Sequence, residues 1–430
     1  MWKRILALSL AVLMMIMTAA CAGDGGQQTA EDQEILVWMP SLAPDGNDKE
    51  VWGGIVKPFE EENNVKVNFE FISWKDYEAK YASGIQMGNG PDVGYLYVEM
   101  FPDYIDAGLV EPIEDYLTQE DRDDYLYLEA GKIWDRVYGL PLSIGNPVAL
   151  FYNQDILDSI GESAPETWED VRRIAQKATA DTDGDGKIDQ WGLAQGWGQS
   201  FSQDLNWNWY SFVFQAGGDL FDEKGRVIMD QEPAVEAATF LYDLKNTDHA
   251  LPEDCMAQTN SEMFANYFIT GKAAMSFGGV NLANAQLLDG KDSDFEYGFT
   301  LKLKNKIEST RCGLDQMVVM SAAPDKELAA KLIKYMTGPV GNGQWHQVTQ
   351  GAPVSRSEEN HAFPMLKEAL EGNEDIVRPL TPALRAPQVY EYLWKALQEM
   401  MNGNSTPEET MKDVTEYGNS LPYERQSDSE

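Results

Sequence analysis

The hydrophobic positions of this chain follow two periods that alternate along the sequence. Residues 34–39 form a short apolar run typical of buried strands, and residues 65–71 alternate between apolar and polar side chains, as half-buried strands do. Over residues 49–63, between these segments, apolar side chains recur at helical spacing. A second helix is expected at 74–86 and a further strand at 91–97. Strands that alternate with helices predict α/β units joined by right-handed crossovers.

The same alternation continues to the end of the chain. Thr167 stands three residues before Asp170, which is the spacing of a helix-capping box, and the apolar residues that follow share one helical face. Later helices are expected at 232–246, 261–270, 325–337, 387–401 and 407–416, and strands near 273–278, 297–303 and 316–321. No period of roughly 20 to 50 residues recurs, which excludes solenoids and propellers.

Length and composition narrow the class of protein. A chain of 430 residues is too long for one compact core, so we expect two domains or one large α/β unit. The 33 basic and 71 acidic residues give a formal net charge of -38, which repels nucleic acids and anionic lipid headgroups. Nucleic-acid binding is therefore not expected. A mean hydropathy of -0.41, with no apolar run of about 20 residues, excludes a polytopic membrane protein.

The N-terminus has the features of an export signal. Lys3 and Arg4 precede an apolar stretch at 5–17, followed by small residues and Cys21. The small residues before Cys21 resemble the lipobox of bacterial lipoproteins, which implies removal of residues 1–20 and lipidation of that cysteine. An ordinary signal peptide with a chance cysteine is the alternative. Residues 21–32 are small and polar and are expected to form a flexible tether.

Cysteine and histidine content argues against a disulfide framework and against histidine chemistry. Only Cys255 and Cys312 remain after processing, and they form either a single bridge or two buried thiols. Neither cysteine belongs to a CxxC motif. The chain has only three histidines, so neither a zinc site of several histidines nor a catalytic triad is expected.

Residues 181–192 have the spacing of a twelve-residue calcium loop. Positions 1, 3, 5, 7 and 9 are taken by Asp181, Asp183, Asp185, the backbone carbonyl of Lys187, and Asp189. Carboxylates this close repel one another unless a cation lies among them. Gly192 stands at position 12, where an EF-hand has a bidentate glutamate. We expect a structural calcium ion here, and the alternative is a solvated acidic turn.

Six segments, in order along the chain, resemble the family 1 extracellular solute-binding proteins of ABC importers, the class that includes maltose-binding protein. They cover nearly the whole of the expected mature chain and are 88–117, 138–157, 164–171, 214–227, 268–279 and 403–414. The segment at 138–157 departs from the family in having one more residue between Pro141 and Ala149, which affects the local loop.

The resemblance implies an α/β fold of two hinge-linked lobes, the type II periplasmic-binding-protein-like fold. Lobe 1 is expected at 33–145 plus 305–356 and lobe 2 at 146–304 plus 357–430. Hinge positions would lie near Asn146, Thr300 and Pro353. The lobes would close on a carbohydrate, and an ABC transporter permease would read the closed form. The protein would be extracytoplasmic, monomeric and anchored to the bacterial membrane through Cys21.

The resemblance also indicates which residues contact the ligand. Glu99 stands where maltose-binding relatives have an acidic hydroxyl acceptor, and Asn146 stands where they have an acid. Trp207 and Tyr390 align with aromatic platforms. Asn281 replaces a tryptophan that is common in the family, which points to a ligand other than a maltodextrin. The remaining candidates are Trp209 and Tyr210 beside Trp207, and Trp38 and Trp74 at strand ends near the expected cleft.

Two other functions are compatible with the composition. A secreted glycoside hydrolase would also be acidic, aromatic-rich and stabilised by calcium, but it needs a defined carboxylate pair, and no pair stands out among 71 acids. A binding protein for a peptide or polyamine is the other alternative. No catalytic residue is expected, and no cofactor beyond calcium.

Overall fold

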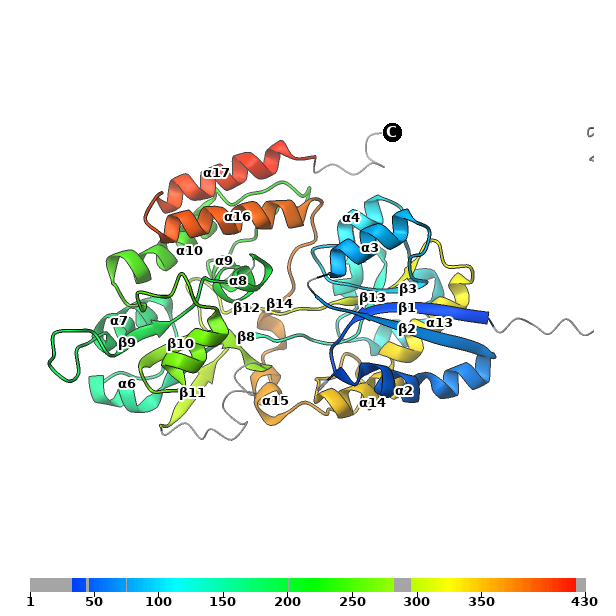
Figure 1. The fold of residues 1–430 in the computed structure, drawn as a ribbon, viewed down its shortest axis with the longest axis horizontal. Coiled ribbons are helices and arrows are strands. Elements are labelled where there is room, and N and C mark those ends of the chain that lie inside the picture. The colour runs from blue at the N-terminus through cyan, green and yellow to red at the C-terminus, as the bar shows by residue number, and fades with distance from the viewer. Residues whose placement is uncertain (1–32, 44–45, 75, 200, 282–294, 423–430) are drawn as a thin grey trace, which may run out of the picture.

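The computed structural model describes residues 33–43, 46–74, 76–199, 201–281 and 295–422. These residues form two lobes that lie side by side, as Figure 1 shows. The predicted two-lobed α/β fold is confirmed. The export signal, Cys21 and the tether lie outside the described residues. Within the described residues, no helix is both long and apolar enough to cross a membrane.

Lobe 1 is built on a mixed sheet whose first strands are parallel. The order is β2 (Val65–Ile72), β1 (Gln33–Pro40), β3 (Val93–Leu96), β13 (Gln316–Met320) and β4 (Val110–Glu111), with β7 (Gly139–Pro141) also paired to β13. Strands β1 and β2 pair from Gln33 with Val65 to Pro40 with Ile72. Strand β13 runs antiparallel to β3 and comes from a distant part of the chain.

Helices enclose the lobe 1 sheet and bury its apolar side chains. They are α2 (Asp48–Asn63), α3 (Tyr77–Gln86), α4 (Phe101–Asp106), α5 (Gln119–Asp124), α13 (Lys326–Thr337) and α14 (Pro339–Thr349). Trp52 of α2 stacks on Trp345 of α14, with ring centroids 4.8 Å apart. Such large buried rings dominate the hydrophobic stabilisation of a core.

Lobe 2 has a four-stranded sheet in the order β11 (Tyr297–Thr300), β8 (Val148–Asn153), β10 (Ala273–Gly279) and β9 (Trp191–Ala194). Its helices are α6 (Gln154–Ile160), α7 (Trp168–Ala178), α8 (Phe201–Asn208), α9 (Tyr210–Gln215), α10 (Glu232–Tyr242), α11 (Asn260–Met263), α16 (Ala386–Met401) and α17 (Pro407–Ser420). The predicted capping box of Thr167 and Asp170 is confirmed at the start of α7. The helices predicted at 232–246 and 261–270 each end in a π-helical turn, at Asp243–Thr247 and Phe264–Phe268.

Two segments that cross between the lobes bond to each other; we call residues 142–147 and 312–315 the crossover segments. Their backbones are joined by Gly145 N–H donating to Gly313 O at 2.7 Å, and by Leu142 N–H donating to Asp315 O at 3.3 Å. A small apolar core surrounds them and includes Cys312. The third connection leaves α14, passes through α15 (Pro364–Leu370) and reaches lobe 2 at β14 (Val377–Arg378).

The structure places the second crossing later in the chain than the expected hinge near Thr300. Residues 305–311 were expected in lobe 1, but the N–H groups of Lys306 and Ile307 donate to Gln215 O of α9. Strand β12 (Thr310–Arg311) pairs with β14 of lobe 2. The chain therefore enters lobe 1 only after Arg311, because its last lobe 2 contacts precede the crossover segment.

Cys255 and Cys312 are buried, free thiols. Cys255 belongs to the core of lobe 2, whereas Cys312 belongs to the core around the crossover segments. The expected alternatives were a single disulfide bridge and two buried thiols, and the structure has two buried thiols.

Candidate ligand-binding site

An aromatic surface lies where the parallel strands of lobe 1 end; Trp74 is its exposed ring, and Tyr77 and Tyr95 beside it are buried. Trp74 follows β2 by two residues and is 51% exposed. Its ring centroid lies 5.5 Å from that of Tyr77 and 6.1 Å from those of Tyr95 and Tyr97. Ligands of open α/β sheets bind outside the carboxyl ends of the strands. Trp74 is therefore placed and exposed as a ligand platform would be.

Glu99 lies beside this surface, three residues after β3, and is partly buried. Burial raises its pKa to about 7, Arg311 opposes that change, and Asp315 adds to it. The preceding residue, Val98, packs into the core of lobe 2. Glu99 therefore belongs to the surface along which the lobes meet.

Lobe 2 brings two predicted tyrosines to the same place. Tyr210 of α9 and Tyr390 of α16 are buried and meet edge to face, with ring centroids 5.3 Å apart. Burial raises the pKa of both phenols well above the ordinary value, and the charge of Glu99 raises both further. The structure thus brings together the predicted residues Glu99, Tyr210 and Tyr390, which are far apart in the sequence.

The end of β12 and the crossover segment after it contribute two charged residues that the sequence analysis missed. Arg311 is 8% exposed, and Asp315 accepts a hydrogen bond from the hydroxyl of Tyr95 at 2.7 Å. Burial raises the pKa of Asp315, while Tyr95 and Arg311 oppose the rise. The signal in the sequence is the presence of two opposite charges beside the apolar strand 316–320.

The three other predicted tryptophans differ in exposure. Trp38 is 2% exposed in the core of lobe 1 and packs edge to face on Tyr81, with ring centroids 5.3 Å apart. Trp209 is fully buried in the core of lobe 2, whereas Trp207 is partly exposed on α8. In this structure Trp38 and Trp209 are thus packing residues, because neither presents a ring face to solvent.

The two predicted asparagines contact each other. The Oδ1 atom of Asn146 accepts a hydrogen bond from the backbone N–H of Asn281 at 2.7 Å. The Asn146 side chain also lies directly over Gly279, leaving no room for a Cβ atom there. Asn281 itself is exposed. Asn146 therefore ties a crossover segment to the end of β10.

The acidic loop after α7 gathers three of its carboxylates. Oxygen atoms of Asp181, Asp183 and Asp189 lie within 4.8 Å of one another. Both oxygens of Asp181 accept backbone N–H groups, from Gly184 and Gly186, at 2.7 Å each. These bonds, that from Gly186 above all, lower the pKa of Asp181. Asp185 is outside the cluster of three, and its side chain instead accepts from the backbone N–H of Lys187.

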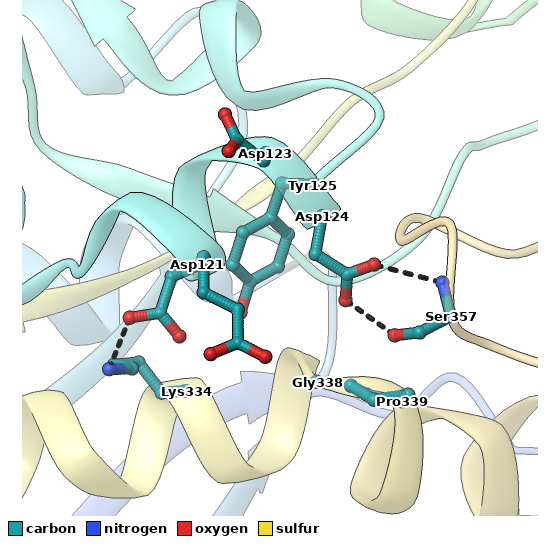
Figure 2. A pocket seen from close by; sticks show the side chains of 9 residues that line it. Asp121, Asp123, Asp124, Tyr125, Lys334, Gly338, Pro339 and Ser357 are labelled. Atoms are coloured by element: carbon teal, nitrogen blue, oxygen red, sulfur yellow. Dashed lines mark hydrogen bonds and ion pairs between the residues drawn. The ribbon is translucent and has the colours of Figure 1, made fainter.

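Two hollows lie away from the predicted residues. One, of about 880 Å³, spans the lobes between the 132–135 hairpin and the segments 222–226 and 381–384. The other, of about 660 Å³, is an acidic hollow of lobe 1 (Figure 2). In it Lys334 pairs with Asp121 at 2.5 Å, and Asp124 accepts from Ser357. These bonds join α5 to the elements that follow β13.

Comparisons with known proteins agree on one family. The family described as bacterial extracellular solute-binding protein matches residues 43–343. The diacetylchitobiose binding protein DasA of Streptomyces coelicolor is 25% identical over 345 residues, covering 75% of this chain and 75% of its own. The sn-glycerol-3-phosphate-binding periplasmic protein UgpB of Escherichia coli is 24% identical over 387 residues, covering 80% and 83%.

A solved structure agrees in fold. An ABC substrate-binding protein from Listeria monocytogenes in complex with cycloalternan superposes with a TM-score of 0.71 at 22% identity, covering 91% of this chain and 99% of that one. The family and these relatives are described as binding proteins and not as enzymes. With its two lobes, its crossover segments and a family match over most of its length, this chain belongs to the bacterial extracellular solute-binding proteins.

Proposed function

We propose that the protein captures a carbohydrate between its two lobes and delivers it to the permease of an ABC importer. The observation that carries the proposal is the exposed ring of Trp74 against Tyr95, whose hydroxyl donates to Asp315. Asp315, Arg311 and Glu99 act on one another electrostatically where the lobes meet. Sugars present C–H groups on their faces and hydroxyls on their edges. An aromatic platform next to charged donors and acceptors complements both.

The test is a thermal-shift screen of mono- and oligosaccharides, followed by calorimetry of each hit and an assay for released reducing sugar. We expect one carbohydrate to raise the melting temperature and to be recovered unchanged. Measurable hydrolysis would replace the proposal with the glycoside hydrolase alternative. A shift with peptides or polyamines and with no sugar would support a non-sugar solute.

We also propose that the chain is held at the membrane by lipidation of Cys21 and acts as a monomer. The support is the small-residue sequence before Cys21 and the polar tether after it. Metabolic labelling with an alkyne fatty acid should label the wild-type protein and leave Cys21→Ala unlabelled. An unlabelled wild-type protein would favour an ordinary signal peptide. Gel filtration tests the oligomeric state.

Finally, we propose that the acidic loop holds a structural calcium ion. The carboxylates of Asp181, Asp183 and Asp189 offer the hard oxygen ligands that calcium prefers, and the carbonyl of Lys187 is a fourth candidate. Asp185, which the sequence pattern includes, would act through water or after a side-chain rotation. The loop begins three residues after α7, so the ion would fasten a surface turn of lobe 2.

A further inference from the structure

Arg311 is a buried cation whose side chain is not fully bonded. It ends β12, directly before the crossover segment, and its backbone N–H donates to Ser211 Oγ at 3.0 Å. Its guanidinium lies beside Gly313, where a Cβ atom would stand 3.7 Å from Nη1. Its Nε atom has no hydrogen-bond partner among the described residues. Burying a charged donor without a partner is costly, so such a group is expected where a ligand completes the bonding.

Two half-buried carboxyl groups from different parts of the chain lie within electrostatic reach of this guanidinium. Asp315 lies four residues along the crossover segment and is oriented by the hydroxyl of Tyr95 at 2.7 Å. Glu99 comes from lobe 1, and the charge of Arg311 acts on both carboxyl groups. Donor and acceptors therefore lie in one region where the lobes meet, with Arg311 buried, both carboxyl groups half-buried, and the phenols of Tyr210 and Tyr390 on the lobe 2 side.

The charges of this group select the chemistry of its ligand. One guanidinium beside two carboxylates leaves no excess positive charge, so a phosphate or carboxylate on the ligand would meet repulsion. A hydroxyl group both donates and accepts. Two neighbouring hydroxyls can accept from the guanidinium fork and donate to the carboxylates, which satisfies all three side chains.

We propose that Arg311, Asp315 and Glu99 together hold two neighbouring hydroxyls of an uncharged sugar ring at the crossover segments, with Arg311 as the shared donor. This inference rests on the proposed function and makes it more specific, since it excludes acidic sugars and phosphate esters as preferred ligands. It also places one end of the ligand against the segment that links the lobes.

The experiment compares Arg311→Met and Arg311→Lys with the wild type by calorimetry. The probes are maltotriose, arabinotriose, diacetylchitobiose and digalacturonate. We expect the wild type to bind at least one neutral probe more tightly than digalacturonate. Arg311→Met should weaken that binding by about 10- to 100-fold, because a hydrogen bond from a charged group is lost. Arg311→Lys should also weaken it, because the amine lacks the planar fork.

Arg378→Lys is the matched control. Arg378 stands opposite Arg311 in the β12–β14 pair, but its guanidinium pairs with Asp219 at 3.1 Å and lies over the ring of Phe214. Its substitution should change affinity less than about twofold. Circular dichroism melting checks folding, and Arg311→Lys, which keeps charge and stem, carries the test if Arg311→Met does not fold.

Three outcomes overturn the inference. If both Arg311 variants bind the neutral sugar like the wild type, Arg311 does not contact the ligand and the proposed function stands. If digalacturonate binds more tightly than the neutral probes, the site takes acidic sugars and the proposed function again stands. A wild type that binds none of the four probes, nor any sugar of the thermal-shift screen, contradicts the proposed function, and the inference with it.

Discussion

At the scale of single residues, the two tryptophans of lobe 1 proposed as ligand contacts have opposite environments. Both Trp38 and Trp74 stand near strand ends, and the sequence alone does not separate them. Trp38 lies in β1, which pairs with β2 on one side and β3 on the other. Strands inside a covered parallel sheet are buried on both faces. Trp74 lies beyond the end of β2 and keeps half its surface exposed.

Trp74→Ala should weaken carbohydrate binding about tenfold or more while leaving the melting temperature nearly unchanged, because an exposed ring contributes little to the core. Trp38→Ala is the contrasting variant and should lower the free energy of unfolding by about 3–5 kcal/mol. Calorimetry and urea unfolding measure the two effects. Unchanged affinity in Trp74→Ala would remove this ring from the site.

Glu99 should make stability depend on pH. Its pKa of about 7 in the folded protein lies above its ordinary value of 4.5. Its contribution to stability is therefore full below about pH 4.5 and is lost as the pH rises through about 7. The charged groups that act on Glu99 are Arg311, Asp315 and Glu78, and the phenols beside it are Tyr97, Tyr210 and Tyr390.

The comparison is with Glu99→Gln, which has no titrating group at that position. Between pH 4.5 and pH 8 the wild type should lose on the order of 1–3 kcal/mol relative to this variant. Urea unfolding at several pH values measures the difference. A difference that stays constant with pH would show that the folded state does not perturb Glu99.

At the scale of elements, the sequence predicts local structure well and long-range placement poorly. The capping box of Thr167 and the helices later in the chain follow from neighbouring residues, and they are present as predicted. The proximity of Arg311 to Glu99 depends on the packing of segments about two hundred positions apart, which no local period encodes. The resemblance named Glu99, Tyr210 and Tyr390 as candidates, and it did not name Arg311.

The acidic loop offers a prediction at this scale. If calcium is bound, EDTA should lower the melting temperature by several degrees, because the ion stabilises only the folded loop. Asp183→Ala should abolish the difference in melting temperature between samples with EDTA and samples with calcium. Asp185→Ala should reduce it less, since its carboxylate is outside the cluster of three. A wild-type melting curve that EDTA leaves unchanged would identify the loop as a solvated turn.

At the scale of the whole molecule, one ion pair joins the lobes directly. Both the backbone N–H and the Nη1 atom of Arg385, just before α16, donate to Asp103 Oδ1 in α4, at 2.9 and 2.8 Å. Arg385 holds a left-handed backbone, with φ of +61°, to make this contact. Non-glycine residues adopt that conformation at a cost, which the paired contact offsets. The pair therefore favours the side-by-side arrangement of the lobes seen in Figure 1.

Asp103→Asn should shift the ligand-free protein toward a more open shape, because it removes the charge that holds Arg385. Small-angle X-ray scattering should show a larger radius of gyration for this variant than for the wild type, and saturating carbohydrate should reverse the increase. Asp106→Asn, a variant on the same helix, is the control. Equal radii for all three proteins would assign the pair to local packing alone.

The position of β13 in lobe 1 also bears on how the protein is made. This strand pairs with β3, β4 and β7, yet it lies more than two hundred residues after β3. When β1, β2 and β3 have left the ribosome, β13 has not yet been synthesised. It is the strand that joins β3 to β4 in the sheet. The N-terminal third of the nascent polypeptide therefore remains without its tertiary partner through most of synthesis. For an extracellular protein, this delay favours threading through a secretion pore, which admits a chain before it has folded.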